Sequence, residues 1–112
     1  MAAGNYDIVI DQGSDYALQL QIAADGSNVN LTNQSARAQM RPTATSSTLT
    51  ATFTCSVVSV TEGKIRIALT NSQTAAISPG KYYYDVELVN AGTSTVTRLI
   101  QGIVRVTAEV TR

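Results

Sequence analysis

The sequence predicts an all-β protein, and three observations support this prediction. Apolar and polar residues alternate with a period of two along most of the chain, which is typical of half-buried strands. Turn-forming residues separate the alternating runs about every 8–12 residues, and no segment keeps a helical period. The length, 112 residues, is that of one domain. We therefore expect residues 1–112 to form a single immunoglobulin-like antiparallel β-sandwich of seven to eight strands with short extended termini.

The last third of the chain, residues 81–110, carries the strongest pattern. A polar connection at Ala91-Gly92 separates two long alternating runs, so we expect a hairpin at the centre of the core. The alternation changes phase at Gly102, where we expect a β-bulge. The residues expected to face inward are Tyr82, Tyr84, Val86, Leu88, Val104, Val106 and Val110.

The pattern in the first part of the sequence predicts two strands and a hairpin turn. Residues 6–10 form a short strand with Tyr6, Ile8 and Ile10 on one face. Residues 16–22 alternate most cleanly, so their apolar side chains are expected in the core. A hairpin turn is predicted at Asp25-Gly26, because Gly accepts the positive φ that such turns need, and a short strand returns over residues 29–32.

Three further strands precede the hairpin. Residues 36–41 alternate, and Pro42 ends that strand because it has no amide donor. A Ser/Thr loop then leads to an alternating run at residues 49–57, and a turn at Glu62-Gly63 leads to another at residues 64–69. The inward residues of these strands are expected to be Ala36, Ala38, Met40, Leu49, Ala51, Phe53, Cys55, Val57, Ile65, Ile67 and Leu69.

Residues 71–78 interrupt the alternation. Asn71 or Ser72 is expected to cap one helical turn over residues 74–77, because short polar side chains accept hydrogen bonds from the free amides at a helix start. We expect Ile77 to plug the end of the core, and Pro79-Gly80 to turn the chain into the tyrosine-rich strand.

Charge and composition narrow the possible partners. The formal net charge is zero, so we expect no binding to nucleic acid or to an anionic membrane. A near-neutral surface favours self-association. No stretch approaches the ~18 apolar residues of a membrane helix, and the N-terminal residues lack the pattern of a signal peptide. We expect synthesis in a reducing cytoplasm, with the one cysteine, Cys55, buried and inert.

The residue types that usually carry catalysis are missing or poorly placed. There is no His, which is the commonest general base and transition-metal ligand. Asp7, Asp11 and Asp15 straddle two strands and a turn, so we interpret them as solvated rather than as a Ca²⁺ loop. Asp85 and Glu87 share an outer strand face, which usually serves solubility. We predict no enzymatic activity, no cofactor and no metal.

Arginine outnumbers lysine, and its planar guanidinium suits bidentate contacts to carboxylates. Two interpretations remain open, namely ion pairs within the chain and a salt-bridge patch between subunits. The adjacent tyrosines suggest a sugar-stacking platform, but only Tyr83 is expected to face outward. The candidate partner contacts are Arg37, Arg41, Arg66, Tyr83, Arg98, Arg105 and Arg112.

Several runs occur together that resemble a known family. They are YDIVIDQGSDYALQLQI with the following DG turn, LTNQSARAQMRPT, GKIRIALTNSQTAAISPGKYYYDVEL and TVTRLIQGIVRVTAEVTR. With these runs the chain resembles the short Ig-like virion proteins of tailed bacteriophages, including those of cyanophages. It is similar in pattern to the N-terminal Ig-like modules of upper-baseplate proteins. The resemblance extends from Tyr6 to Arg112.

The resemblance implies a non-enzymatic structural subunit of a virion, in the tail, baseplate or neck, present in multiple copies on a symmetric particle. Its partners would be other phage virion proteins, bound through sheet faces, edge strands and the terminal residues 1–5 and 108–112. We expect a stand-alone accessory subunit, because the sequence ends at Arg112 without the fibre-binding domain of a baseplate module. The alternatives are a capsid decoration protein and a carbohydrate-binding or host-adhesion module.

Overall fold

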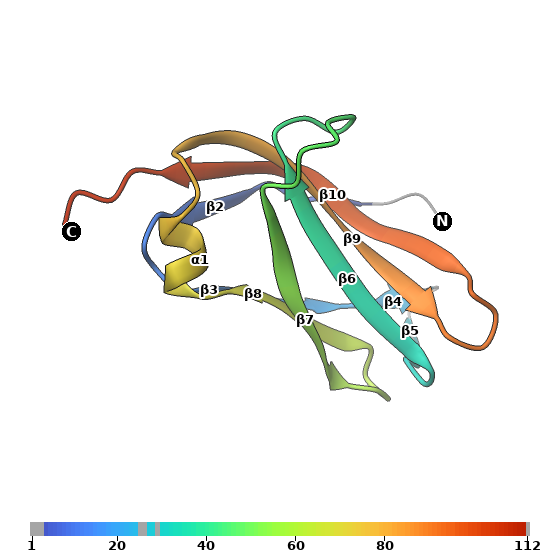
Figure 1. Ribbon diagram of the computed structural model, residues 1–112. Coiled ribbons are helices and arrows are strands. Elements are labelled where there is room, and N and C mark those ends of the chain that lie inside the picture. The colour runs from blue at the N-terminus through green and yellow to red at the C-terminus, as the bar shows by residue number, and fades with distance from the viewer. Residues whose placement is uncertain (1–3, 25–26, 29, 112) are drawn as a thin grey trace.

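Strands in two layers enclose one apolar core in the computed structural model, which describes residues 4–24, 27–28 and 30–111 (Figure 1). The elements in chain order are β1 (Gly4–Asn5), β2 (Ile8–Asp11), β3 (Tyr16–Gln21), β4 (Ala23–Ala24), β5 (Ser27–Asn28), β6 (Gln34–Arg41), β7 (Ala51–Ser59), β8 (Lys64–Leu69), α1 (Asn71–Ala75), β9 (Gly80–Asn90) and β10 (Val96–Thr107). The described strands form an eight-stranded sheet in the order β1-β10-β9-β6-β7-β8-β3, with β2 also paired to β10, and a small β4-β5 pair. The predicted all-β fold is confirmed.

Strand β7 joins the two layers. Its first part pairs with β6, where Phe53 lies opposite Ala38. Its second part leaves β6 and pairs with β8, where Cys55 lies opposite Ile67. The continuous sheet therefore curls over at β7, so that β10, β9 and β6 face β8 and β3 across the core. The sandwich is closed at β7, and its opposite side ends in the edges of β2 and β3.

The first strands, β1 and β2, pair in parallel with β10, while the other described strand pairs are antiparallel as predicted. Ile8 lies opposite Val104 and Ile10 opposite Val106. Nearly the whole chain separates these strands, which gives ample length for the crossover that a parallel pair requires. Two carboxylate side chains stabilise the pairing of β2 with β10 by accepting hydrogen bonds. Asp7 Oδ1 accepts a hydrogen bond from the Ile103 amide at 3.0 Å, and Asp11 Oδ1 accepts one from the Thr107 hydroxyl at 2.8 Å.

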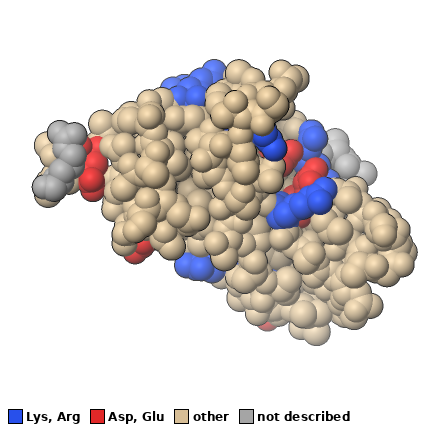
Figure 2. Space-filling model, viewed as in Figure 1, with Lys and Arg blue, Asp and Glu red and all other residues tan. Residues whose placement is uncertain are grey.

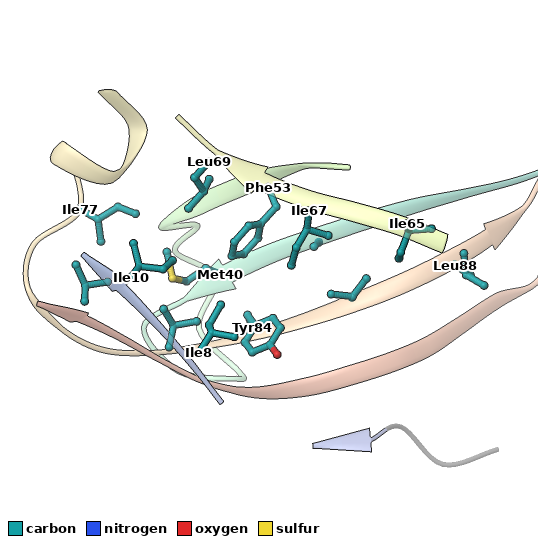
Figure 3. Close-up of a cluster of buried hydrophobic side chains, with 14 of the residues drawn as sticks. Ile8, Ile10, Met40, Phe53, Ile65, Ile67, Leu69, Ile77, Tyr84 and Leu88 are labelled. Carbon is teal, nitrogen blue, oxygen red and sulfur yellow. The ribbon is translucent and has the colours of Figure 1, made fainter. Parts of the chain in front are cut away.

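The inward residues of the alternating strands pack into one cluster (Figure 3). The rings of Phe53 and Tyr84, on the two strands that flank β6, approach to 6.3 Å between centroids at an interplanar angle of 59°. The Tyr84 hydroxyl donates a hydrogen bond to the Tyr6 carbonyl oxygen, so it has a partner. Most of the buried residues are at positions that the period-two pattern predicts, and these include Ile8, Ile10, Ala38, Met40, Ile65, Ile67, Leu69, Val86, Leu88, Val104 and Val106.

Helix α1 begins at Asn71, three residues before the predicted turn at residues 74–77, and Thr70 rather than Asn71 or Ser72 is its N-cap. Thr70 is extended, with φ −78° and ψ 162°. Its hydroxyl accepts a hydrogen bond from the Gln73 amide at 3.2 Å, while the Gln73 side chain accepts one from the Thr70 amide at 2.8 Å. This reciprocal capping box satisfies two amides at once. The predicted burial of Ile77 against the end of the core is confirmed (Figure 3).

Gly102 is needed for a close contact and not for a bulge. The register between β9 and β10 shifts between Arg98 and Ile100, so the irregularity lies earlier than predicted. A Cβ at Gly102 would lie 2.3 Å from the Tyr6 carbonyl oxygen. The link between β1 and β2 therefore passes so close to β10 that a side chain at this position would push it away.

Several predicted inward positions or boundaries differ from the structure. Val110 is 88% exposed because β10 ends at Thr107, three residues before it. Leu49 precedes β7 and is exposed, and Tyr6 lies exposed between β1 and β2. The return strand expected at residues 29–32 is displaced to β5. The turn predicted at residues 25–26 lies outside the described residues.

We predict that Gly102→Ala lowers the free energy of unfolding by about 1–3 kcal/mol, because the new methyl group meets backbone that must shift. Gly92→Ala is the matched control, since a Cβ there meets only the Asn90 Oδ1 atom at 3.4 Å. Urea denaturation of both variants measures the difference. Equal midpoints for the two variants would contradict the close contact.

Ile67→Ala is expected to lower the free energy of unfolding by about 2–5 kcal/mol, because it leaves a cavity at a site with 0% exposure. Val9→Ala removes a side chain that is 58% exposed and is expected to cost about 1 kcal/mol or less. Urea denaturation again provides the measurement. Similar costs for both substitutions would show that Ile67 does not lie in the core.

Candidate partner-binding face

A groove of about 660 Å³ crosses the outer face of β6, β9 and β10, beside the start of the chain. Acidic and basic side chains gather over this part of the molecule, whereas most of the surface in the same view carries neither (Figure 2). We call this surface the β6–β9–β10 face and define it by its outward residues, Arg37, Gln39, Arg41, Tyr83, Asp85, Glu87, Arg98, Gln101 and Ile103.

The strand register brings these residues together. On β9, Tyr83, Asp85 and Glu87 alternate with the buried Tyr84 and Val86, so they project to the opposite side. Each one has outward neighbours on both adjacent strands. In register order these rows are Arg37–Glu87–Arg98, Gln39–Asp85–Gln101 and Arg41–Tyr83–Ile103. The same alternation that builds the core therefore also builds the face.

Ion pairs interleave across the face. Arg37 Nε lies 2.7 Å from Glu87 Oε1, and Arg98 Nε lies 3.3 Å from Asp85 Oδ2. The Arg98 guanidinium also donates to Gln101 Oε1 at 3.1 Å. The arginine side chains of the two pairs are 60% and 51% exposed, so each pair stabilises the fold by at most about 1 kcal/mol. These ion pairs hold the charged side chains in place, so the carboxylates or cations of a partner would bind charges that are already positioned.

Asp85 is the carboxylate of the face whose pKa is shifted. Burial raises the pKa of its carboxyl above the ordinary value, and the negative charge of Glu87 raises it further. The cations Arg98, Arg37 and Arg41 act in the opposite direction and only partly offset this rise in pKa. The ionised Asp85 therefore retains an electrostatic cost that an added cation would relieve.

Arg41 and Tyr83 shape the end of the groove near the loop after β6. The Arg41 guanidinium donates to the carbonyl oxygens of Ser46 and Ser47 at 3.4 and 3.1 Å, and to Gln39 Oε1 at 3.0 Å. Arg41 therefore holds the loop beside the groove. The Lys81 ammonium lies 5.4 Å from the centroid of the half-buried Tyr83 ring. One side of this ring is thus engaged within the chain.

The structure brings most of the predicted contact residues together. Arg37, Arg41, Tyr83 and Arg98 belong to the β6–β9–β10 face, and Arg105 lies further along β10, opposite Lys81. Arg66 instead lies on β8 in the other layer, between Gln19 and Ser56. Arg112 lies outside the described residues. The sequence interpretation treated Asp85 and Glu87 as solubilising only, although their outward alternation between arginine-bearing strands was a signal for this face.

The reactive groups considered from the sequence act structurally. In the described residues, no group of three or more His, Cys, Asp and Glu is placed to hold a metal ion. Asp15 Oδ1 accepts a hydrogen bond from the Asn71 amide at 2.7 Å and so anchors α1. Cys55 is half-buried rather than fully buried, and burial raises the pKa of its thiol, which disfavours the nucleophilic thiolate. No helix within the described ranges is long and apolar enough to span a bilayer.

The fold defines the class of this protein as an immunoglobulin-like β-sandwich. NK cell receptor Nkp44, a triggering partner in natural cytotoxicity, is similar in structure with a TM-score of 0.53 and 13% identity over 96% of this chain and 100% of that one. InlP of Listeria monocytogenes gives a TM-score of 0.46 and 17% identity over 94% of this chain, which spans only 28% of InlP. At this level of identity the likeness to Nkp44 shows the fold alone. No protein-family model matches the sequence, and no curated protein matches it.

We predict that a carbon-detected NMR titration places the pKa of Asp85 above its ordinary value of 3.8, because burial and Glu87 disfavour the charge. The folded state then binds more protons than the unfolded state. Ionised Asp85 therefore lowers the free energy of unfolding at neutral pH. This free energy rises as the pH falls through the folded pKa of Asp85, and the gain is complete below the unfolded pKa.

Arg98→Gln should raise the pKa of Asp85 further, since Arg98 is the cation that lowers it most. Arg105→Gln is the matched control, because Arg105 shares the sheet face but is not among the groups that shift Asp85. A titration midpoint at or below 3.8 in the wild-type chain would contradict this account of the face.

Proposed function

We propose that this protein is a non-enzymatic structural subunit of a tailed-phage virion. It binds neighbouring virion proteins through the β6–β9–β10 face and is present in multiple copies on a symmetric particle. The observation that supports a binding role is the groove of about 660 Å³ lined by interleaved charges on central strands. The phage setting is supported by the sequence runs that resemble Ig-like virion proteins.

A charged face on rigid strands suits recognition of a protein neighbour. Side chains on a sheet are better positioned than those on loops, so less order must be imposed on binding. The pattern of two carboxylates between arginines is complementary to a partner with the reverse pattern, and such complementarity contributes specificity more than affinity. Ile103 adds an apolar patch to the groove, which a partner side chain can cover.

The alternative functions draw less support from the same residues. A sugar-stacking platform requires exposed aromatic faces, whereas Tyr83 is half-buried and lies beside the Lys81 ammonium. An enzyme requires a nucleophile or general base, and the carboxylate of the face with a raised pKa, Asp85, is already paired with Arg98. A capsid decoration protein would use the same kind of face and differs only in its place on the particle.

The decisive measurement is quantitative mass spectrometry of purified virions. We expect the chain in a fixed stoichiometric ratio to the major virion proteins. Its absence from particles whose genome encodes it would overturn the proposed function.

Substitutions then test the face itself. Tyr83→Ala combined with Arg98→Ala removes contacts from the β6–β9–β10 face, and we expect incorporation into particles to fall about tenfold or more, the loss expected from truncating central interface residues. Arg66→Ala is the matched control, because Arg66 is an exposed arginine on the other layer. Equal incorporation of the two variants would place the contact elsewhere.

A further inference from the structure

Strand β3 is a sheet edge with no described strand on its outer side. It pairs with β8 from Tyr16, opposite Leu69, to Gln21, opposite Lys64. In the described sheet it is the terminal strand of the layer. The unpaired side of such a strand presents backbone N–H and C=O groups at every second residue, which is a template for a further strand.

The core is unfinished along this edge. Tyr16, Leu18 and Leu20 point inward but are only half-buried. Their direct neighbours on β8 are Leu69, Ile67 and Ile65, which are fully buried in the same layer. The exposure therefore begins at the last strand, and one more strand beside β3 would cover these side chains.

Proteins usually protect a free edge, and β3 lacks the usual protection. Its sequence, YALQLQ, contains no charged residue and no proline, and its register with β8 is regular. Natural edges carry lysine, proline or a bulge to block pairing. The edge of β2 in the other layer contrasts with β3, because β2 contains the charged residue Asp11 within the strand. Pairing of two β2 edges would bring like charges together, whereas pairing of two β3 edges would not.

We infer that β3 is a self-association edge, and that its partner is the β3 strand of a second copy of this chain in antiparallel pairing. The layer that contains β8 and β3 in one copy would then join the same layer of the second copy into one continuous sheet across a two-fold axis. Inward residues must face inward residues, because a one-residue slip would turn the apolar side chains to solvent. The register with the most inward pairs places Leu18 opposite Leu18 of the second copy and Tyr16 opposite Leu20.

This register completes the packing that the single chain leaves open. Each Tyr16 ring would lie against an aliphatic side chain of the other copy, a cross-strand pairing that stabilises sheets. On the outer side, Ala17 would lie opposite Gln19. No charge would be buried, so association carries no ionic desolvation cost. The inference does not depend on the proposed function, because β3 belongs to the layer opposite the β6–β9–β10 face.

The test uses lysine substitutions at the outer positions Ala17 and Gln19, which face each other in this register. Analytical ultracentrifugation of the wild-type chain is expected to show a dimer of twice 11.8 kDa. In Ala17→Lys combined with Gln19→Lys, like charges face each other across the axis, and dimerisation should weaken about tenfold or more. The corresponding pair of Glu substitutions should weaken it as well. An equimolar mixture of the Lys and Glu variants should restore the dimer as a mixed species.

Thr52→Lys combined with Thr54→Lys is the matched control, because both residues are exposed on β7, away from the β3 edge, where Thr52 pairs with β6 and Thr54 with β8. This variant should dimerise as the wild type does. Hydrogen exchange should slow on dimerisation at those amides of residues 16–20 that point away from β8. A wild-type chain that sediments as a monomer at its solubility limit, unimpaired dimerisation of the Lys variant, or failure of the mixture to restore the dimer would each overturn the inference.

Discussion

The alternation along β9 is the constraint on which the rest of the structure depends. The strand pairs with β6 along one edge and with β10 along the other, so each of its faces is bordered by side chains of both neighbours. Tyr84, Val86 and Leu88 fill the core from one face. From the other face, Asp85 and Glu87 meet the arginines of the neighbouring strands. A shift by one residue would exchange the two sets and destroy both the core and the charged face.

Tyr6 and Asp7, near the start of the chain, are held against β9 and β10 by several close contacts. The Tyr84 hydroxyl donates to the carbonyl oxygen of Tyr6, and Gly102 allows the backbone of Tyr6 to approach β10. Asp7 then secures the Ile103 amide. Because Asp7 and Gly102 also line the groove, the same contacts fix one wall of the β6–β9–β10 face. The fold and the candidate site therefore share their anchoring residues.

Much of the fold was predictable because period two is a local property. The inward residues of β6, β8 and β9 follow directly from it, and the turn at Gly63 follows from a turn-forming residue between two alternating runs. The reason for Gly102 was not predictable, because the atom that it approaches lies on Tyr6, 96 residues earlier in the chain. The parallel pairing of β2 was missed for the same reason. The burial of Val110 was overpredicted because alternation does not reveal where pairing ends.

The candidate site was only partly predictable. Alternation identified Arg37, Arg41 and Arg98 as outward, but it does not tell which of two layers a strand joins. Arg66 has the same local pattern as Arg37, yet β8 carries it to the opposite layer. The pairing of Arg98 with Asp85 also depends on the register shift before Ile100, which tertiary packing sets.

The two surfaces assigned to partners differ in the symmetry that they favour. The β6–β9–β10 face mixes both signs of charge without a two-fold repeat, so it suits a different surface on a neighbour. The β3 edge is neutral and matches itself when reversed, which is the requirement of an isologous contact. An isologous contact closes after two copies, whereas a heterologous contact continues around a ring. Because the two surfaces lie on opposite layers, one subunit has room to use both at once. Dimers formed through β3 would then bind their neighbours through the β6–β9–β10 face.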